Sequence, residues 1–226
     1  DVSRLMAGAW GTLGLLTEVS LKVLPVAPAE ATLRFECNQA DALRKLHAWG
    51  GQPLPLNASC WVEDAGVGQL YVRLRGAVAA VDAACKSMGG TRLDNATAAP
   101  DWQACREQTL PWFAARLARP GQALWRLSLP ATAPVLALPG GVSPLVEWHG
   151  ALRWVQAPLA HGDVLREAAR AVGGSASLFI ADGAGGERAG GQFDLKSAAL
   201  EQIHARLKHS FDPAGIFNPG RMAPQW

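Results

Sequence analysis

A glycine-rich segment near the start of the chain has the composition of a loop that lies against a ligand. Gly8, Gly11 and Gly14 surround Trp10 and Thr12. Glycines at this spacing let the backbone approach a flat or anionic ligand closely and expose amide N–H groups to it. The segment lacks the G-x-G-x-x-G pattern of a dinucleotide-binding loop. Spacing alone therefore favours an ordinary glycine-rich turn over a cofactor loop.

A second candidate site lies in the middle of the chain, where His149 is followed by Arg153 and flanked by Trp148 and Trp154. An arginine at this position could hold a carboxylate through two parallel hydrogen bonds, and the histidine could act as a general base. The alternative is a hairpin stabilised by tryptophan packing and arginine–aromatic contact, without catalysis. The residue pattern favours the alternative, so these are the weaker candidates.

The cysteines and histidines indicate no metal centre. The four cysteines are at least 20 residues apart and form no C-x-x-C pair, which zinc and iron–sulfur sites usually contain. We expect them to be buried thiols. The histidines are equally scattered and form no His-x-His pair: His47, His149, His161, His204 and His209.

The composition is that of a globular protein, with 49% apolar and 18% charged residues and a net charge of +2. The basic residues are dispersed, which argues against nucleic-acid binding. Every apolar run is shorter than the ~20 residues that a membrane-spanning helix requires. The chain begins at Asp1 without a methionine, so we expect a piece of a longer protein. The nine tryptophans suggest that some of them lie at an interface.

Alternating and helical patterns predict the elements that must position these residues. Residues 17–23 alternate as a strand, which the proline-containing stretch 24–28 ends as a linker. The next segment predicts the order β-α-β-β-α-β of a ferredoxin-like unit. Its strands are 31–37, 58–64, 69–75 and 91–96, and its helices are 41–49 and 77–88.

The second half of the chain partly repeats this order. Leu200, Ile203, Leu207 and Phe211 form an apolar stripe on its last helix. The predicted elements are a helix over 100–119 broken at Pro111, a strand over 123–129, a short helix over 131–138, two strands within 145–156, a helix over 163–172, a strand over 175–181, a glycine-rich mobile loop over 183–191 and a helix over 195–211. The fold class is α+β: two ferredoxin-like units form one antiparallel sheet with helices on one face.

The sequence near the end of the chain predicts several tight turns. Residues 211–213 read Phe-Asp-Pro, and 218–222 read Asn-Pro-Gly-Arg-Met. Proline and glycine at this density indicate a rigid tail docked onto another surface, which could also be the surface of the same domain.

These two terminal motifs carry a resemblance to a known family. The opening, with Gly11, Thr12 and Gly14, resembles the end of the FAD-binding domain in vanillyl-alcohol-oxidase-type flavoproteins, and the Phe-Asp-Pro to Asn-Pro-Gly tail resembles the carboxyl-terminal signature of that superfamily. The motifs at 124–130 and 148–154 look like those of the FAD-binding subunit of bacterial glycolate oxidase. The resemblance runs from end to end.

The resemblance implies a domain arrangement. Residues 1–28 would be the remnant of the FAD domain with its linker. Residues 29–210 would be the cap or substrate domain in two halves, about 29–97 and 98–210. Residues 211–226 would dock toward the flavin domain. The loop against FAD would consist of Trp10, Gly11, Thr12, Gly14, Leu16, Thr17 and, from the tail, Asn218.

The resemblance also implies a function: FAD-dependent oxidation of the 2-hydroxy acid glycolate to glyoxylate, beside a second flavoprotein subunit and an iron–sulfur subunit. The phosphate-binding part of the FAD site is absent, so we expect the chain alone to be inactive and to retain no FAD. A cytoplasmic location is implied, or one peripheral to the inner membrane. Two alternatives stay open: oxidation of D-lactate or another 2-hydroxy acid, and a module that serves subunit assembly without catalysis.

Overall fold

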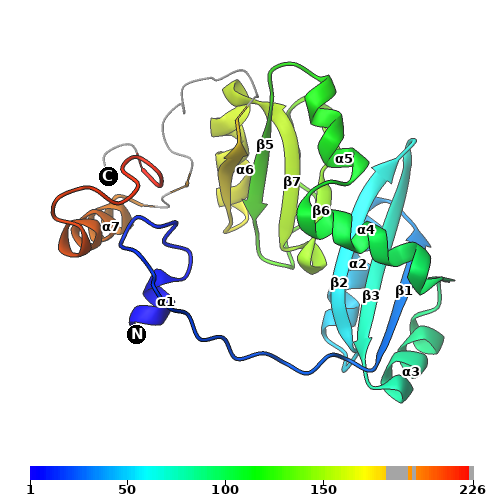
Figure 1. The fold of residues 1–226 in the computed structure, drawn as a ribbon. Helices are drawn as coiled ribbons and strands as arrows, with labels where there is room; N and C mark the ends of the chain where they lie inside the picture. Colours follow the sequence, from blue (N-terminus) through cyan, green and yellow to red (C-terminus); the bar gives the residue numbers. More distant parts are fainter. Residues whose placement is uncertain (182–192, 195–196, 224–226) are drawn as a thin grey trace.

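A computed structural model describes residues 1–181, 193–194 and 197–223 (Figure 1). Its centre is one eight-stranded antiparallel sheet with the order β4-β1-β3-β2-β6-β7-β5-β8. The strands are β1 Ala29–Glu36, β2 Leu56–Asp64, β3 Val67–Gly76, β4 Thr91–Leu93, β5 Gln122–Ser128, β6 Leu145–Glu147, β7 Leu152–Pro158 and β8 Ser175–Ile180. The helices are α1 Val2–Met6, α2 Gln39–Gly50, α3 Val78–Met88, α4 Asn95–Glu107, α5 Pro111–Ala114, α6 Gly162–Ala171 and α7 Ala198–Phe211. Short 3₁₀ turns are η1 Ala115–Ala118, η2 Pro139–Gly141, η3 Trp148–Gly150 and η4 Leu159–His161.

The sheet consists of two halves with the same internal order. In each half, the first and third strands along the chain are the central pair, and the second and fourth lie outside them. The halves join where β2 pairs with β6, at Cys60 opposite Glu147 and Trp61 opposite Val146. The predicted α+β class with an antiparallel sheet is confirmed. The first half has the complete β-α-β-β-α-β order.

The second half lacks the helix predicted over 131–138. Residues 129–138 instead form an irregular segment with a turn. Pro130, Pro134 and Pro139 cannot donate backbone hydrogen bonds, which disfavours a helix here. The carbonyl oxygens of Ala133 and Pro134 accept hydrogen bonds from the guanidinium of Arg153 instead, at 2.7 and 2.6 Å. The Arg153 side chain therefore supplies the hydrogen-bond donors that backbone N–H groups would have supplied to these carbonyl oxygens in a helix.

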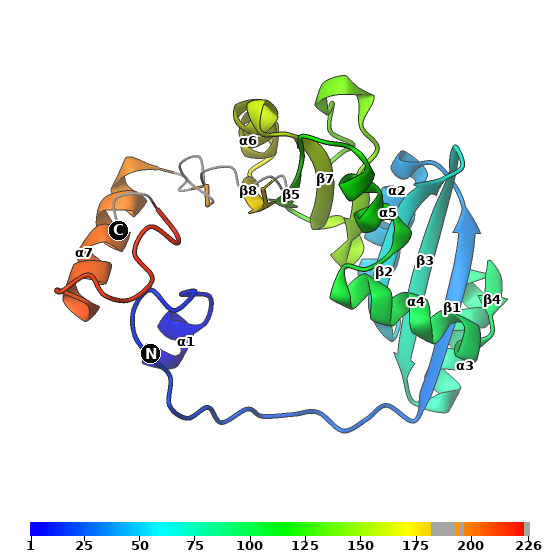
Figure 2. The same ribbon diagram turned by 45° about the horizontal axis from the view of Figure 1, so that its top comes forward.

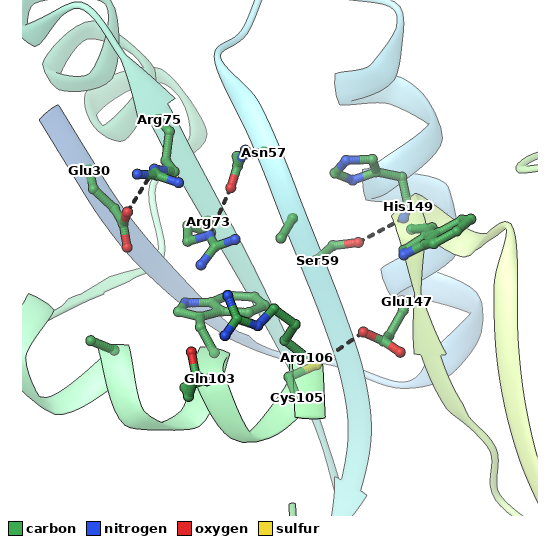
Figure 3. Close-up of a pocket in the computed structure, with 14 residues that line it drawn as sticks. Glu30, Asn57, Ser59, Arg73, Arg75, Gln103, Cys105, Arg106, Glu147 and His149 are labelled. Atoms are coloured by element: carbon green, nitrogen blue, oxygen red, sulfur yellow. Dashed lines mark hydrogen bonds and ion pairs between the residues drawn. The ribbon is translucent and has the colours of Figure 1, made fainter. Parts of the chain in front are cut away.

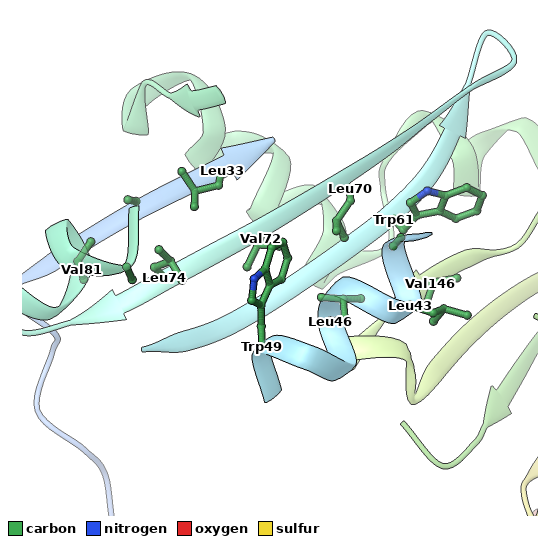
Figure 4. Close-up of a cluster of buried hydrophobic side chains, with 13 residues drawn as sticks. Leu33, Leu43, Leu46, Trp49, Trp61, Leu70, Val72, Leu74, Val81 and Val146 are labelled. Atoms are coloured by element: carbon green, nitrogen blue, oxygen red, sulfur yellow. The ribbon is translucent and has the colours of Figure 1, made fainter. Parts of the chain in front are cut away.

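Helices cover both faces of the sheet rather than one. On one face, α2 and α3 pack over Leu33, Leu70 and Val72 (Figure 4), and α6 packs in the same layer over β5, β7 and β8. On the opposite face, α4 and α5 place Trp102 and Phe113 against β2, β5 and β7. Figure 1 shows α4 in front of the strands and α2 behind them. The prediction of a single helical face was wrong, because the segment between the halves crosses the second face.

The helix that crosses this second face begins earlier than predicted. Asp94 caps α4 by accepting a hydrogen bond from the Thr97 backbone N–H, so the helix starts at Asn95 and the preceding strand ends at Leu93. It ends at Glu107, and the following residue Gln108 caps it in a left-handed conformation. The predicted break at Pro111 is confirmed, since Pro111 begins the separate helix α5.

Residues 17–23 do not form the predicted strand. They run without a ladder partner, and Val19, Leu21 and Val23 are 62%, 80% and 80% exposed. Alternation predicts a strand only where another strand supplies the hydrogen bonds, and no described strand lies beside this segment. Figure 2 shows the segment as an extended connection between α1 and β1.

The two ends of the described chain lie together. Figures 1 and 2 both place α7 beside the N-terminal segment and away from the sheet. The helix α7 is confirmed, but Leu200, Ile203 and Phe211 of its apolar stripe are exposed rather than buried. The glycine-rich loop predicted over 183–191 lies outside the described residues. Within the described residues, no helix combines the length and the apolar character needed to cross a bilayer.

Candidate functional site

A buried lysine joins the two ends of the chain. The ammonium of Lys208, on the last turn of α7, donates to the carbonyl oxygens of Thr12 and Phe217, both at 2.7 Å, and to the Asp212 carboxylate at 2.5 Å. All three ammonium hydrogens therefore have an acceptor. We call residues 8–14 together with 208–222 the terminal cluster.

Asp212 completes this arrangement. Its carboxylate accepts from the backbone N–H groups of Ile216 and Phe217, at 3.1 and 2.8 Å, in addition to Lys208. Burial raises the pKa of Asp212, but the hydrogen bonds from Lys208, Phe217 and Ile216 outweigh burial and lower it to about 2. The carboxylate is thus ionised at neutral pH and fixes the turn that follows α7.

The tail also holds the glycine-rich loop directly. Asn218 donates from its side-chain amide to the carbonyl oxygen of Trp10 at 2.9 Å. Gly11 has a φ of +70°, and a Cβ there would lie 2.7 Å from Asn218 Nδ2. Only glycine fits this position without displacement. The Trp10 ring packs against Phe193, with centroids 5.5 Å apart, and the Arg221 guanidinium lies 5.2 Å from its centroid.

The structure brings together four of the predicted cofactor-loop residues: Trp10, Gly11, Thr12 and Asn218. Thr12 is buried, and its hydroxyl donates to the Ala9 carbonyl oxygen at 2.7 Å, so it shapes the loop from within. Gly14 lies at the end of the same loop and is half-buried, while Leu16 and Thr17 follow it on the exposed connection.

A cavity of about 580 Å³ lies on the α4 face of the sheet, where β6 ends and the chain turns at 148–150 (Figure 3). Helical periodicity positions its wall. Trp102 and Cys105 lie on the row of α4 that packs on the sheet, and Gln103 and Arg106 lie on the adjacent row. Alternation along β3 aims Arg73 and Arg75 to the same side. The remaining lining residues are Glu30, Asn57, Ala58, Ser59, Ala99, Glu147, Trp148 and His149.

His149 lines this cavity from a strained turn. Trp148, His149 and Gly150 all have positive φ values, of 50°, 54° and 98°. The backbone N–H of His149 donates to Ser59 Oγ at 2.8 Å. Burial lowers the pKa of His149, so its imidazole is neutral at pH 7. Strained non-glycine residues of this kind concentrate at functional sites.

Arg153 does not join His149 in one site. Its side chain is fully buried on the α6 face and donates to two backbone carbonyl oxygens of the irregular 129–138 segment. Burial lowers its pKa to about 10, which leaves it charged at neutral pH. The two terminal nitrogens of the guanidinium hold the backbone and do not face the cavity of His149, so the geometry favours the structural interpretation of Arg153 over a carboxylate clamp.

Comparison with known proteins gives one close relative. No family model matches the chain. Over 222 residues, the chain is 42% identical to the glycolate oxidase subunit GlcE of Escherichia coli strain K12. The predicted resemblance is confirmed. The aligned region is 98% of this chain and 57% of GlcE, so the chain spans little more than half the length of that relative.

The similarity to GlcE covers both the terminal cluster and the sheet cavity, because it extends over almost the whole chain. Sequence reasoning missed the central residue of each. Lys208 lies on the polar side of a predicted amphipathic helix, and Arg73 lies in an ordinary alternating strand. The Phe-Asp-Pro motif places Asp212 four residues after Lys208, so the sequence offered an ion-pair partner for Lys208 but no sign of its burial.

The cysteines and tryptophans divide between core and surface. Cys60 and Cys105 are buried, whereas Cys37 and Cys85 are half-buried. Of the described tryptophans, Trp10 and Trp148 are exposed, and each lies in one of the two candidate sites. Within the described ranges, no three histidine, cysteine or acidic side chains gather into a group that could hold a metal ion.

Proposed function

We propose that this chain is part of an FAD-linked subunit of glycolate oxidase, which oxidises glycolate to glyoxylate. The observation that carries the proposal is 42% identity to the glycolate oxidase subunit GlcE over 98% of the chain. In the proposed complex, the subunit works beside a second flavoprotein subunit and an iron–sulfur subunit.

The terminal cluster suits one wall of a flavin site. A Cβ at Gly8 would meet no atom within 4 Å, so the backbone there is open to a ligand, and Leu15, Leu16 and Thr17 present exposed surface beside it. When bound, FAD would supply the redox chemistry, and the protein would supply its binding and orientation. The loop at 8–17 would contact the cofactor, while phosphate contacts would come from outside these residues.

The residues of the cluster have different proposed roles. Trp10, Gly11 and Gly14 would approach the cofactor through the loop backbone, with Leu16 and Thr17 at its edge. Thr12, Lys208 and Asn218 would act by positioning, because their polar groups are already engaged within the cluster. A loop held at three points needs little reorganisation when the cofactor binds.

The contacts of Lys208 refine the proposed domain boundary. The sequence suggests that the cap ends at residue 210, which would leave α7 with the sheet. Lys208 binds residues 12, 212 and 217 instead. We therefore propose that α7 and the tail belong with residues 1–28 on the flavin side, and that the two sheet halves alone form the cap.

A chimera tests the proposal. The aligned region of E. coli GlcE would be replaced by this chain and expressed in a strain that lacks GlcE. Restored glycolate-dependent dye reduction in the extract, with a flavin absorbance spectrum in the purified chimera, is the expected result. A chimera carrying Gly11→Trp, which blocks the loop, should lose the flavin spectrum.

The same experiment separates the alternatives. Activity with D-lactate but not with glycolate would show that the proposed substrate is wrong and that the proposed flavin cofactor is right. A folded chimera that co-purifies with the other subunits, contains no flavin and restores no activity would favour the assembly module and would refute the proposed enzyme function.

A further inference from the structure

The cavity on the α4 face contains a charged group that the flavin proposal does not use. Three arginines and two glutamates line it, which leaves one positive charge in excess. Glu147 is engaged, since it accepts from Trp154 Nε1 at 2.5 Å and from the Cys105 thiol at 3.0 Å. The charge that the cavity can offer to a ligand therefore depends on which of its arginines have an anionic partner.

Two of the three arginines are paired with carboxylates. Arg75 lies 2.9 Å from Glu30, and Arg106 lies 2.9 Å from Glu107, where both side chains are largely exposed. Arg73 differs. Its Nε donates to the neutral side-chain oxygen of Asn57 at 2.8 Å, and within the described part of the chain no carboxylate lies at ion-pair distance from it.

The Arg73 side chain is held in one orientation. Its guanidinium lies 5.1 Å from the centroid of the Trp102 ring, and Trp102 is itself fixed by a 2.9 Å hydrogen bond from its indole N–H to Thr32 Oγ1. With Nε bound to Asn57, the two terminal nitrogens remain directed at the cavity. Figure 3 shows Arg73 and Arg106 reaching into the same part of it. A guanidinium presented in this way suits a planar carboxylate.

Further polar groups surround this cation. Ser59 accepts from the His149 backbone N–H, which leaves its own hydroxyl hydrogen to be donated. The side-chain Nδ1 of His149 is buried, with no hydrogen-bond partner in the part of the chain described. Buried polar atoms normally have a partner, so this atom is consistent with a ligand or water at this place. Trp102 and Trp148 add flat apolar surface.

We propose that this cavity binds a small organic monocarboxylate, with Arg73 as its main contact and Arg106 as the second. The Arg73 guanidinium, which has no carboxylate at ion-pair distance in the described part of the chain, matches one carboxylate, and the volume leaves room for an apolar or aromatic body beside Trp102 and Trp148. The proposal does not depend on flavin binding, because the cavity is formed by the sheet, α4 and the turn at 148–150.

Tryptophan fluorescence of the purified 226-residue chain provides the test, since two tryptophans line the cavity. The chain is titrated at low salt with glycolate, D-lactate and mandelate, and with uncharged glycolamide as the neutral probe. We expect saturable quenching by the carboxylates and none by glycolamide. The carboxylate that binds most tightly indicates whether the site prefers a small or an aromatic body.

Three variants assign the binding to its residues. Arg73→Gln should weaken binding about tenfold and Arg106→Gln about threefold, as expected for the loss of one charge-assisted contact. Arg34→Gln is the matched control, because Arg34 is exposed on the same face of the sheet, does not line the cavity and changes the net charge equally. Arg34→Gln should bind like the unaltered chain.

Several results would overturn the proposal: no saturable quenching by any of the three carboxylates, equal quenching by glycolamide, or equal weakening by Arg34→Gln and Arg73→Gln. If Arg73→Gln proves unfolded by circular dichroism, Arg73→Lys replaces it. This variant should still weaken binding, because lysine keeps the positive charge but cannot form two parallel hydrogen bonds to a carboxylate. Unchanged binding in a folded Arg73→Lys protein would then count against the arginine contact. Since flavin is absent from the assay, its failure leaves the proposed oxidase function standing.

Discussion

The ammonium of Lys208 lies 2.7 Å from the carbonyl oxygen of Thr12, although the two residues are 196 positions apart in the chain. The same ammonium binds the tail through Phe217, so one buried cation fixes the glycine-rich loop and the proline-containing tail to each other. The ends of the chain therefore form one unit, and the properties of that unit can be tested residue by residue.

Replacing Lys208 should release the loop. Lys208→Met keeps the side chain long and flexible but leaves two carbonyl oxygens without the ammonium donor and the Asp212 carboxylate with its backbone donors alone, which is costly for buried groups. We expect amide hydrogen exchange in residues 9–14 to accelerate by roughly a hundredfold. Exchange in β3 and β5 should stay unchanged. Arg206→Met, an exposed change on the same helix, is the control, and equal acceleration by both variants would contradict the role of Lys208.

The terminal cluster should loosen in acid. The folded-state pKa of Asp212, about 2, lies below the ~3.9 of an unfolded aspartate, so ionised Asp212 stabilises the folded cluster above pH ~4. That stabilisation is lost as the pH falls from about 4 through about 2. Pepsin, which is active in this range, should cleave the tail progressively faster after correction for its own pH dependence. In Asp212→Asn the cleavage should be fast at each pH, and an equally steep dependence in both proteins would exclude Asp212 as the titrating group.

Two glycines of the loop allow a matched comparison. Gly8 and Gly11 both have positive φ values, but only at Gly11 would a Cβ collide with Asn218. Gly8→Ala should cost about 1 kcal/mol of stability through backbone strain, and Gly11→Ala should cost about 1–3 kcal/mol more. Adding Asn218→Ala should recover part of the loss in Gly11→Ala and none in Gly8→Ala. Urea unfolding of these four variants, of Asn218→Ala alone and of the unaltered chain measures this. If the effects of Gly11→Ala and Asn218→Ala simply add, the contact between residue 11 and Asn218 contributes nothing to stability.

Much of the sheet could be predicted from the sequence, because alternation and turn residues are local signals. Leu70, Val72 and Leu74 alternate with Tyr71 and Arg73, and the two sets do lie on opposite faces of β3. The same signal failed at residues 17–23, since alternation says nothing about whether a partner strand exists. It also could not assign α4 to the second face, because that choice depends on where the chain crosses the sheet.

The candidate sites were less predictable than the sheet. Trp10 and Asn218 were expected near each other only through the family resemblance, since no local pattern relates residues so far apart. Lys208 could not be recognised as buried, because a lysine on a helix is usually exposed. Arg153 shows the reverse problem: its spacing from His149 suggested a shared site, whereas strand alternation directs its side chain to the α6 face.

Arg153 should matter for stability and not for ligand binding. The guanidinium is fully buried and donates to the carbonyl oxygens of Ala133 and Pro134, which lie in a segment without a helix. Arg153→Met should lower the free energy of unfolding by about 3 kcal/mol, as two hydrogen bonds from a charged group disappear. Arg126→Met, which removes a half-buried arginine bonded to Ser128, should cost less than about 1 kcal/mol.

Carboxylate titration of the same two variants completes the argument. The α4-face cavity does not include Arg153, so folded Arg153→Met protein should quench with the affinity of the unaltered chain. A variant that kept its stability and lost carboxylate binding would instead establish Arg153 as the clamp suggested by its spacing from His149. Because the two interpretations predict opposite results in both measurements, one denaturation curve and one titration decide between them.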